Sequence, residues 1–66
     1  MKFTVYDFSE YFGFLYLQSD DYEHEVQVDV DGCYDDELEA WNDEQVKQLA
    51  EQQVRDCFGP MAYIAW

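Results

Sequence analysis

The segment Glu23–Asp31 carries the pattern that most constrains the fold of this chain. Val26, Val28 and Val30 alternate there with four acidic residues and one glutamine. Because successive side chains of a strand point to opposite faces, the alternation predicts a strand with a buried apolar face and an exposed acidic face. We therefore expect a sheet whose valine face packs against another layer of structure.

Two earlier segments also have the composition of strands. Residues 2–8 are rich in β-branched and aromatic side chains, and simple alternation places Phe8 on the same face as Tyr6. Residues 11–18 are almost all apolar, which predicts a central strand with both faces covered. Gly13 within this segment indicates a bulge or a bend.

A helix is predicted over residues 43–58. Asn42 is a suitable N-cap, and Gln45 stands where it can complete a capping box. Gly59 suits the position after the last helical turn, and Pro60 prevents the helix from continuing. Spacing of three and four residues predicts the face that packs on the sheet, which consists of Val46, Leu49, Ala50, Gln53, Val54 and Cys57.

These elements predict a single domain, residues 1–66, of the α+β class. We expect a small antiparallel sheet packed on one face by a single amphipathic helix, with Trp41, Phe58, Trp66 and the aromatic residues of the second strand filling the interface. An acidic loop is expected over residues 32–42. Within this segment, two alternatives remain open for residues 33–41, namely a loop and an irregular first turn of a helix. The order is β-β-β-α-β, over residues 2–8, 11–18, 23–31, 43–58 and 61–66.

The segment Asp20–Glu44 holds 12 of the 16 acidic residues and no Lys or Arg, in a chain with a formal net charge of −13. Such a charge opposes compaction through self-repulsion. The chain is nevertheless 20% aromatic, unlike disordered acidic tails. Two interpretations remain open, namely an acidic surface that serves solubility and a surface that meets a cationic partner.

The chain lacks the residue combinations of common active sites, so we expect no enzyme, no catalytic residue, no cofactor and no metal site. His24, the only histidine, is on the valine-facing side of the third strand, where a partly buried structural role is favoured. No hydrolytic triad, phosphate-binding glycine loop or zinc spacing is present. Aligning Gly32 with the glycine of a calcium-binding loop places Leu38 where a bidentate Glu is required.

No secretory signal and no segment long enough to span a bilayer is apparent, and acidic headgroups would repel this surface. We therefore expect a cytoplasmic protein without a membrane role. Cys33 and Cys57 are expected to be reduced there, and one intramolecular disulfide remains the alternative.

In its short length, high aromatic content, acidic segment Asp20–Glu44 and sheet-plus-helix order, the chain resembles the small acidic antidefence proteins of bacteriophages. The resemblance implies an inhibitor that mimics nucleic-acid phosphates and occupies the basic channel of a host defence complex in the bacterial cytoplasm. That partner would be a CRISPR effector, a restriction enzyme or a similar nucleic-acid-binding protein. Direct binding to nucleic acid is not expected, because three basic residues face 16 acidic ones.

Charge and position alone nominate the residues that would contact such a partner. They are Asp20, Asp21, Glu23, Glu25, Asp29, Asp31, Asp35, Asp36, Glu37 and Glu39.

The alternative is a small acidic interaction module that binds its partner through exposed aromatic side chains, with the charge serving solubility. Tyr and Trp are enriched at the energetic centres of interfaces. A core this small has little room for every aromatic residue, and homodimerisation stays open. The aromatic residues that do not all fit in such a core are Tyr11, Tyr22, Tyr34, Tyr63 and Trp66.

Overall fold

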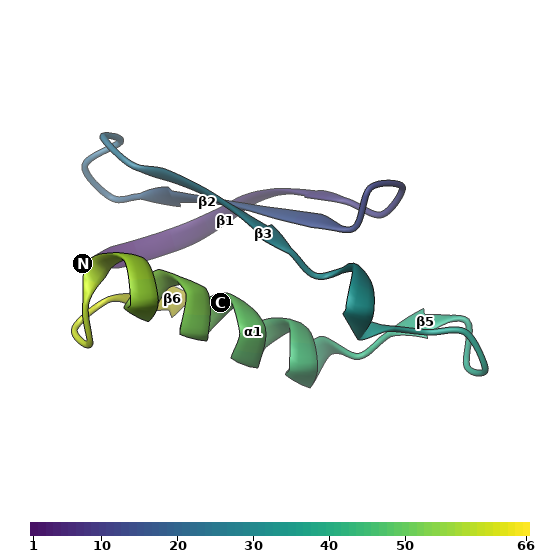
Figure 1. Cartoon of the computed structure of the whole chain (residues 1–66). Helices are drawn as coiled ribbons and strands as arrows, with labels where there is room; N and C mark the ends of the chain where they lie inside the picture. Colours follow the sequence, from purple (N-terminus) through teal and green to yellow (C-terminus); the bar gives the residue numbers. More distant parts are fainter.

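A four-stranded sheet with one helix beneath it forms the body of the protein (Figure 1). The computed structural model describes all residues 1–66. From the N-terminus the elements are β1 (Lys2–Ser9), β2 (Phe14–Ser19), β3 (Glu25–Asp29), the 3₁₀ turn η1 (Asp31–Cys33), β4 (Tyr34–Asp35), β5 (Ala40–Trp41), α1 (Asp43–Phe58) and β6 (Tyr63–Ala65).

The strand order is β3-β2-β1-β6, with β1, β2 and β3 forming an antiparallel meander. The predicted α+β class and the central position of β2 are confirmed. The last strand differs from the expectation, because β6 pairs with β1 in parallel and makes the sheet mixed. After two reversals β3 runs parallel to β1, and α1 then carries the chain beneath the sheet to its other edge, as a crossover helix does.

Residues 11–13, expected in the second strand, instead belong to the turn between β1 and β2. Gly13 adopts φ +70°, and a Cβ added there would lie 2.8 Å from the Cβ of Asp31. The Gly13 carbonyl also accepts a 2.8 Å hydrogen bond from the Val30 amide. The close approach of residue 13 to Asp31 therefore explains why a glycine stands there. The expected bulge or bend inside the second strand is not what it marks, because residue 13 lies in a turn.

The bulge lies in β1, where the register to β2 shifts between Val5 and Asp7. Tyr6 is the extra residue, and every later side chain of β1 changes face as a result. Phe8 consequently packs against the core and against Trp41, with ring centroids 5.2 Å apart. The expectation that Phe8 shares a face with Tyr6 is wrong, because simple alternation assumes an unbroken strand.

Residues 33–41 form neither a plain loop nor a helical turn. The end of η1 is followed by the hairpin β4–β5, which projects beyond the sheet (Figure 1). The Asp35 carboxylate accepts hydrogen bonds from the amides of Glu37 (2.9 Å) and Leu38 (3.2 Å), and so closes the hairpin turn. The rings of Tyr34 and Trp41 pack across its two strands at 5.1 Å.

Helix α1 has the predicted bounds. Asn42 accepts a 3.1 Å hydrogen bond from the Gln45 amide, and Gly59, at φ 99°, donates to the Arg55 carbonyl. Only Val46, Ala50 and Val54 of the predicted face are buried, whereas Leu49, Gln53 and Cys57 are exposed. The helix thus contacts the sheet along one narrow row spaced four residues apart. Both cysteines are free. The helix is neither long nor apolar enough to cross a membrane.

The core between sheet and helix is mainly aliphatic, with Phe3 its one fully buried aromatic residue. The expectation that the aromatic residues of the second strand fill this interface is wrong. In β2 the core positions belong to Leu15 and Leu17, and the alternation turns Phe14 and Tyr16 to the other face. Trp66 is 49% exposed, while Trp41 and Phe58 pack at the margin of the core.

Candidate partner-binding surface

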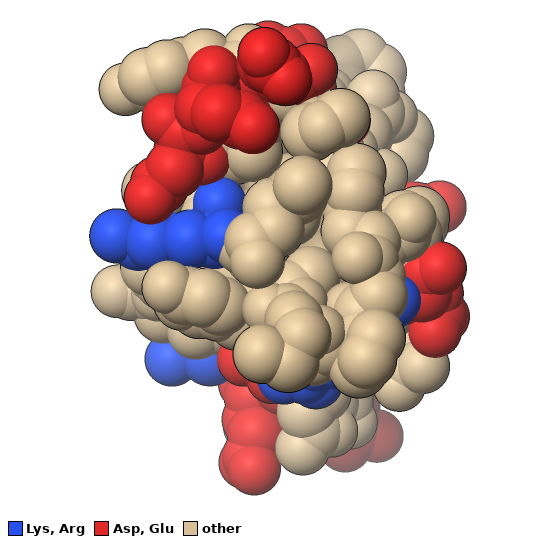
Figure 2. Space-filling model, turned by 90° about the vertical axis from the view of Figure 1, so that its left-hand side faces the viewer, with Lys and Arg blue, Asp and Glu red and all other residues tan.

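The ten nominated carboxylates, here called the acidic row, follow the edge strand β3 and continue into the projecting hairpin. They form three groups along a molecule 38 Å long, not one compact cluster. Figure 2 shows one end of the molecule, where the carboxylates lie in separate groups and Lys or Arg side chains lie next to some of them. The groups are Asp20, Asp21 and Glu23 in the β2–β3 turn, Glu25, Asp29 and Asp31 in and after β3, and Asp35, Asp36, Glu37 and Glu39 in the hairpin.

Three members of the acidic row stabilise the local backbone. Asp21, Asp29 and Asp35 each accept a hydrogen bond from the amide two residues further along the chain, at 2.9–3.1 Å. Such contacts close turns and satisfy amides that no strand partner reaches. Nothing in the sequence distinguishes these three from the others, and their replacement would disturb the fold as well as the charge.

The other seven members are exposed, and their carboxylates make no hydrogen bond or ion pair within the protein. The single ion pair joins Arg55 to Glu51, with 3.5 Å between nitrogen and oxygen, outside the acidic row. The Lys47 ammonium lies 5.7 Å from the centre of the Trp66 ring. None of the protein's three Lys and Arg side chains therefore forms an ion pair with the acidic row.

The β2–β3 turn is held by the buried Ser19. Its hydroxyl donates to the Asp21 carboxylate and accepts from the His24 amide at 3.1 Å. The hydrogen bond from Ser19, with a second from the Glu23 amide, holds the pKa of the Asp21 carboxyl below its ordinary value. Tyr22 lies in this turn at φ 59°, a region that a bulky side chain rarely adopts.

Asp21, Glu23 and His24 place one potential metal-ligating atom each within 4.8 Å of the others. The Asp21 carboxylate already accepts two hydrogen bonds there. His24 is partly buried and packs against Phe58 with ring centroids 5.2 Å apart, which confirms the structural role predicted for it. These three residues are the protein's one group of His, Cys, Asp or Glu side chains with the composition for a metal ion.

Aromatic side chains form a continuous strip on the sheet face opposite the helix, and sequence reasoning placed part of it in the core. Its neighbouring rings have centroids 4.9–6.4 Å apart. No helix or strand covers this face (Figure 1). The alternation of leucines with aromatic residues in β2 was the signal that could have assigned these aromatic residues to the face opposite the helix. We call this strip of rings the aromatic strip, and its members are Tyr6, Tyr16, Phe14, Phe12 and Tyr11.

The sequence correctly identified a second set of aromatic residues as too many for the core. All five are exposed, from Tyr34 as the least exposed to Tyr11 at 89%. They are distributed over the two long turns, the hairpin and the C-terminal strand, and comprise Tyr11, Tyr22, Tyr34, Tyr63 and Trp66.

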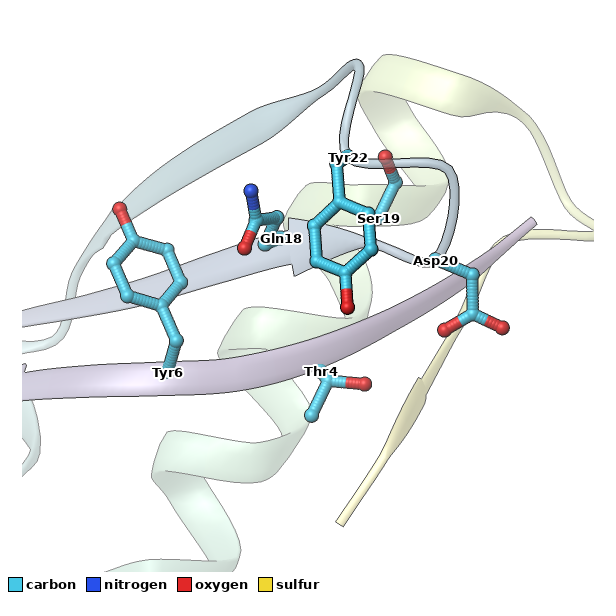
Figure 3. A pocket seen from close by; sticks show the side chains of 6 residues that line it. All are labelled: Thr4, Tyr6, Gln18, Ser19, Asp20 and Tyr22. Carbon is cyan, nitrogen blue, oxygen red and sulfur yellow. The ribbon is translucent and has the colours of Figure 1, made fainter.

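A shallow hollow of about 240 Å³, which we call the tyrosine hollow, lies on the uncovered face of the sheet (Figure 3). Tyr22 extends from the β2–β3 turn over the sheet, and Tyr6 rises from β1 beside it. Burial, and then the nearby charges of Glu25 and Asp7, raise the pKa of the Tyr6 hydroxyl. The hollow is lined by Thr4, Tyr6, Gln18, Ser19, Asp20 and Tyr22.

Comparison with known proteins gives no relative from which a function could be transferred, because no family model, curated protein or solved structure matches this chain.

Proposed function

We propose that this protein is a stoichiometric inhibitor that binds a basic nucleic-acid-binding protein or complex through the acidic row. The partner would be a component of a host defence system in the bacterial cytoplasm, such as a CRISPR effector or a restriction enzyme. Nucleic acid and inhibitor would compete for the same lysine- and arginine-lined site. One observation carries the proposal, namely seven exposed carboxylates along one edge that have no partner within the protein.

The length of the molecule and the number of acids in the row support mimicry of a phosphate backbone. One strand of a duplex presents a phosphate about every 3.4 Å, so a molecule 38 Å long spans about 11 phosphates. The ten acids of the row are close to that number. Glu25 and Asp29 are held by the backbone pairing of β3 with β2, so these charges are ordered before the partner is met.

The same charge favours fast association with a basic partner. Long-range attraction between opposite charges steers encounter and raises the association rate, most strongly at low ionic strength. Binding should therefore weaken as salt is added.

Two variants of equal net charge test the proposal. The row variant carries Glu23→Gln, Glu25→Gln, Asp36→Asn and Glu37→Gln, which avoids the three acids that close turns. Each substitution removes one negative charge, so the net charge changes from −13 to −9. The control variant reaches the same charge through acids outside the row, namely Glu10→Gln, Asp43→Asn, Glu44→Gln and Asp56→Asn.

The immobilised protein should capture basic proteins from a bacterial lysate, and added duplex DNA or RNA should elute them. The control variant should retain this capture and the row variant should lose it, with circular dichroism confirming that both are folded. A captured partner that binds nucleic acid and this protein at the same time, without interference, would contradict mimicry.

The second candidate function is an interaction module whose main contact is apolar, and the uncovered aromatic strip favours it specifically. Salt separates the two candidates. An electrostatic contact weakens as ionic strength rises, whereas an apolar contact is maintained or strengthened. Dissociation constants for the captured partner at 50 and 500 mM NaCl would decide between them.

A further inference from the structure

The tyrosine hollow combines two aromatic rings with a carboxylate at one end of the sheet. Tyr6 and Tyr22 contribute the rings, and Asp20 lies at the opposite end of the hollow from Tyr6 (Figure 3). Thr4 and Gln18 line the hollow between them from the neighbouring strands β1 and β2. All of these side chains project from the uncovered side of the sheet or from the turn above it.

The position of Tyr22 is fixed by the turn that carries it. The Tyr22 amide donates to the Ser19 carbonyl at 3.0 Å, and the Ser19 hydroxyl is bonded to both Asp21 and His24. This network holds Tyr22 at φ 59° with its side chain 77% exposed to solvent. Because the Tyr22 ring is exposed, it contributes little to the core. Its uncommon backbone conformation is therefore better explained by a role in binding.

The electrostatic character of the hollow suits a cation. The Asp20 carboxylate has no ion-pair or hydrogen-bond partner in the protein, and Glu25 and Asp7 add negative charge on the side of Tyr6. Aromatic rings attract cations through the negative charge on their faces, most effectively where water is partly excluded. A volume of about 240 Å³ lies below the ~300 Å³ at which pockets for small-molecule ligands begin, so a single side chain fits better than a cofactor.

We propose that the tyrosine hollow binds one arginine side chain of the protein partner, with the guanidinium against the ring of Tyr22 and hydrogen-bonded to Asp20, and with the methylene stem extending toward Tyr6. Arginine is favoured over lysine because its planar group stacks on rings and donates two parallel hydrogen bonds to one carboxylate. The inference deepens the proposed function, on which it rests. A second copy of this chain is a poorer occupant, because both copies would carry a charge of −13.

The test uses single-residue probes instead of the unidentified partner. The blocked tripeptides acetyl-Gly-Arg-Gly-amide, its lysine counterpart and its citrulline counterpart are titrated into the full-length protein at 150 mM NaCl. Citrulline preserves the shape of arginine and removes its charge. Nuclear magnetic resonance should show the largest shift changes at Thr4, Tyr6, Gln18 and Tyr22 with the arginine peptide, and the weakest binding with citrulline.

Variants identify the ring and the carboxylate. Tyr22→Asn removes the ring while suiting the positive φ, and should weaken arginine binding about 2- to 30-fold. Tyr22→Phe keeps the ring and should bind within about two-fold of the original protein. Asp20→Asn should weaken binding about 2- to 5-fold. The matched control Tyr11→Asn removes an exposed ring in the β1–β2 turn and should have no effect.

Equal affinity for arginine and citrulline, or an unchanged affinity in Tyr22→Asn, would overturn the inference. Equal affinity for the lysine peptide would overturn the choice of arginine. Shifts at the same residues that grow with protein concentration alone would identify a second copy as the occupant. The proposed function fails separately, if nucleic acid does not compete with a captured partner, because that result leaves the peptide titration unaffected.

Discussion

The hydroxyl of the buried Ser19 donates to the carboxylate of Asp21, and this contact closes the turn that carries both the first group of the acidic row and Tyr22. Folding lowers the pKa of Asp21 through this hydrogen bond and the one from the Glu23 amide. The stabilisation is therefore present above the ordinary pKa of 3.8 and is lost as the pH falls through the lower pKa of the folded state.

The first prediction is that Asp21→Asn destabilises the protein at pH 6 and that this effect shrinks progressively as the pH falls below 3.8. Urea denaturation followed by tryptophan fluorescence measures the free energy of unfolding of both proteins at each pH. The general repulsion among the acids weakens in both as the pH falls, so it largely cancels in the difference. A difference in stability that stays constant from pH 6 to the acid limit would show that the Asp21 carboxylate has no special role.

The second prediction concerns the close approach of Gly13 to Asp31. Gly13→Ala places a Cβ 2.8 Å from the Cβ of Asp31 and forces alanine to φ +70°. The backbone conformation alone costs about 1–2 kcal/mol, and the steric contact adds to it. Gly32→Ala is the control, because nothing lies within 4 Å of its added Cβ, and we expect a change below about 0.5 kcal/mol. Chemical denaturation would contradict the prediction if the two variants were equally stable.

The third prediction tests the narrow buried row of α1. Val54→Ala should reduce the free energy of unfolding by about 2 kcal/mol, because two buried methylene equivalents and a cavity are involved. Leu49 is 40% exposed, so Leu49→Ala should cost less than about 1 kcal/mol although it removes a larger group. The reverse order in denaturation experiments would contradict the prediction, because it would mean that Leu49 contributes more to the core than Val54.

The fourth prediction is that salt stabilises the protein. The protein carries a formal net charge of −13 and forms a single ion pair, so repulsion between its negative charges dominates the electrostatics of the folded state. Raising NaCl from 10 to 150 mM shortens the screening length from about 30 to about 8 Å, against a molecule 38 Å long. Each ~1 kcal/mol of relieved repulsion raises Tm by about 4–8 °C in a domain of this size. The row variant should show a smaller rise, and a Tm that falls with salt would refute the explanation.

Local patterns predicted the elements whose signals lie within a few residues. The valine alternation of β3 and the caps of α1 at Asn42 and Gly59 are examples, since each depends only on neighbouring backbone and side chains. The bulge at Tyr6 and the approach of Gly13 to Asp31 were not predictable in the same way. Both depend on pairing with segments distant in the sequence, which no local pattern encodes.

The residues of the candidate surface were likewise predictable from the sequence only in part. Charge alone nominated the acidic row, because Asp and Glu are almost never buried without a partner. It could not distinguish Asp21, Asp29 and Asp35, which close turns, from the seven that are free to meet a partner. The part of the aromatic strip that belongs to the predicted second strand was misplaced in the core, because an apolar run such as Phe14–Leu17 does not indicate which of its faces will be covered.

By itself the sequence determined the approximate positions of the four strands of the main sheet, the bounds of the helix and a surface that must be acidic, because alternation, capping and the cost of burying charge act over short distances. Only the tertiary structure decided that β6 lies parallel to β1 and that one face of the sheet stays uncovered. A single 16-residue helix covers only one side of four strands. The path of the chain between distant segments selects that side, and so leaves Tyr6 and Tyr22 exposed together beside Asp20.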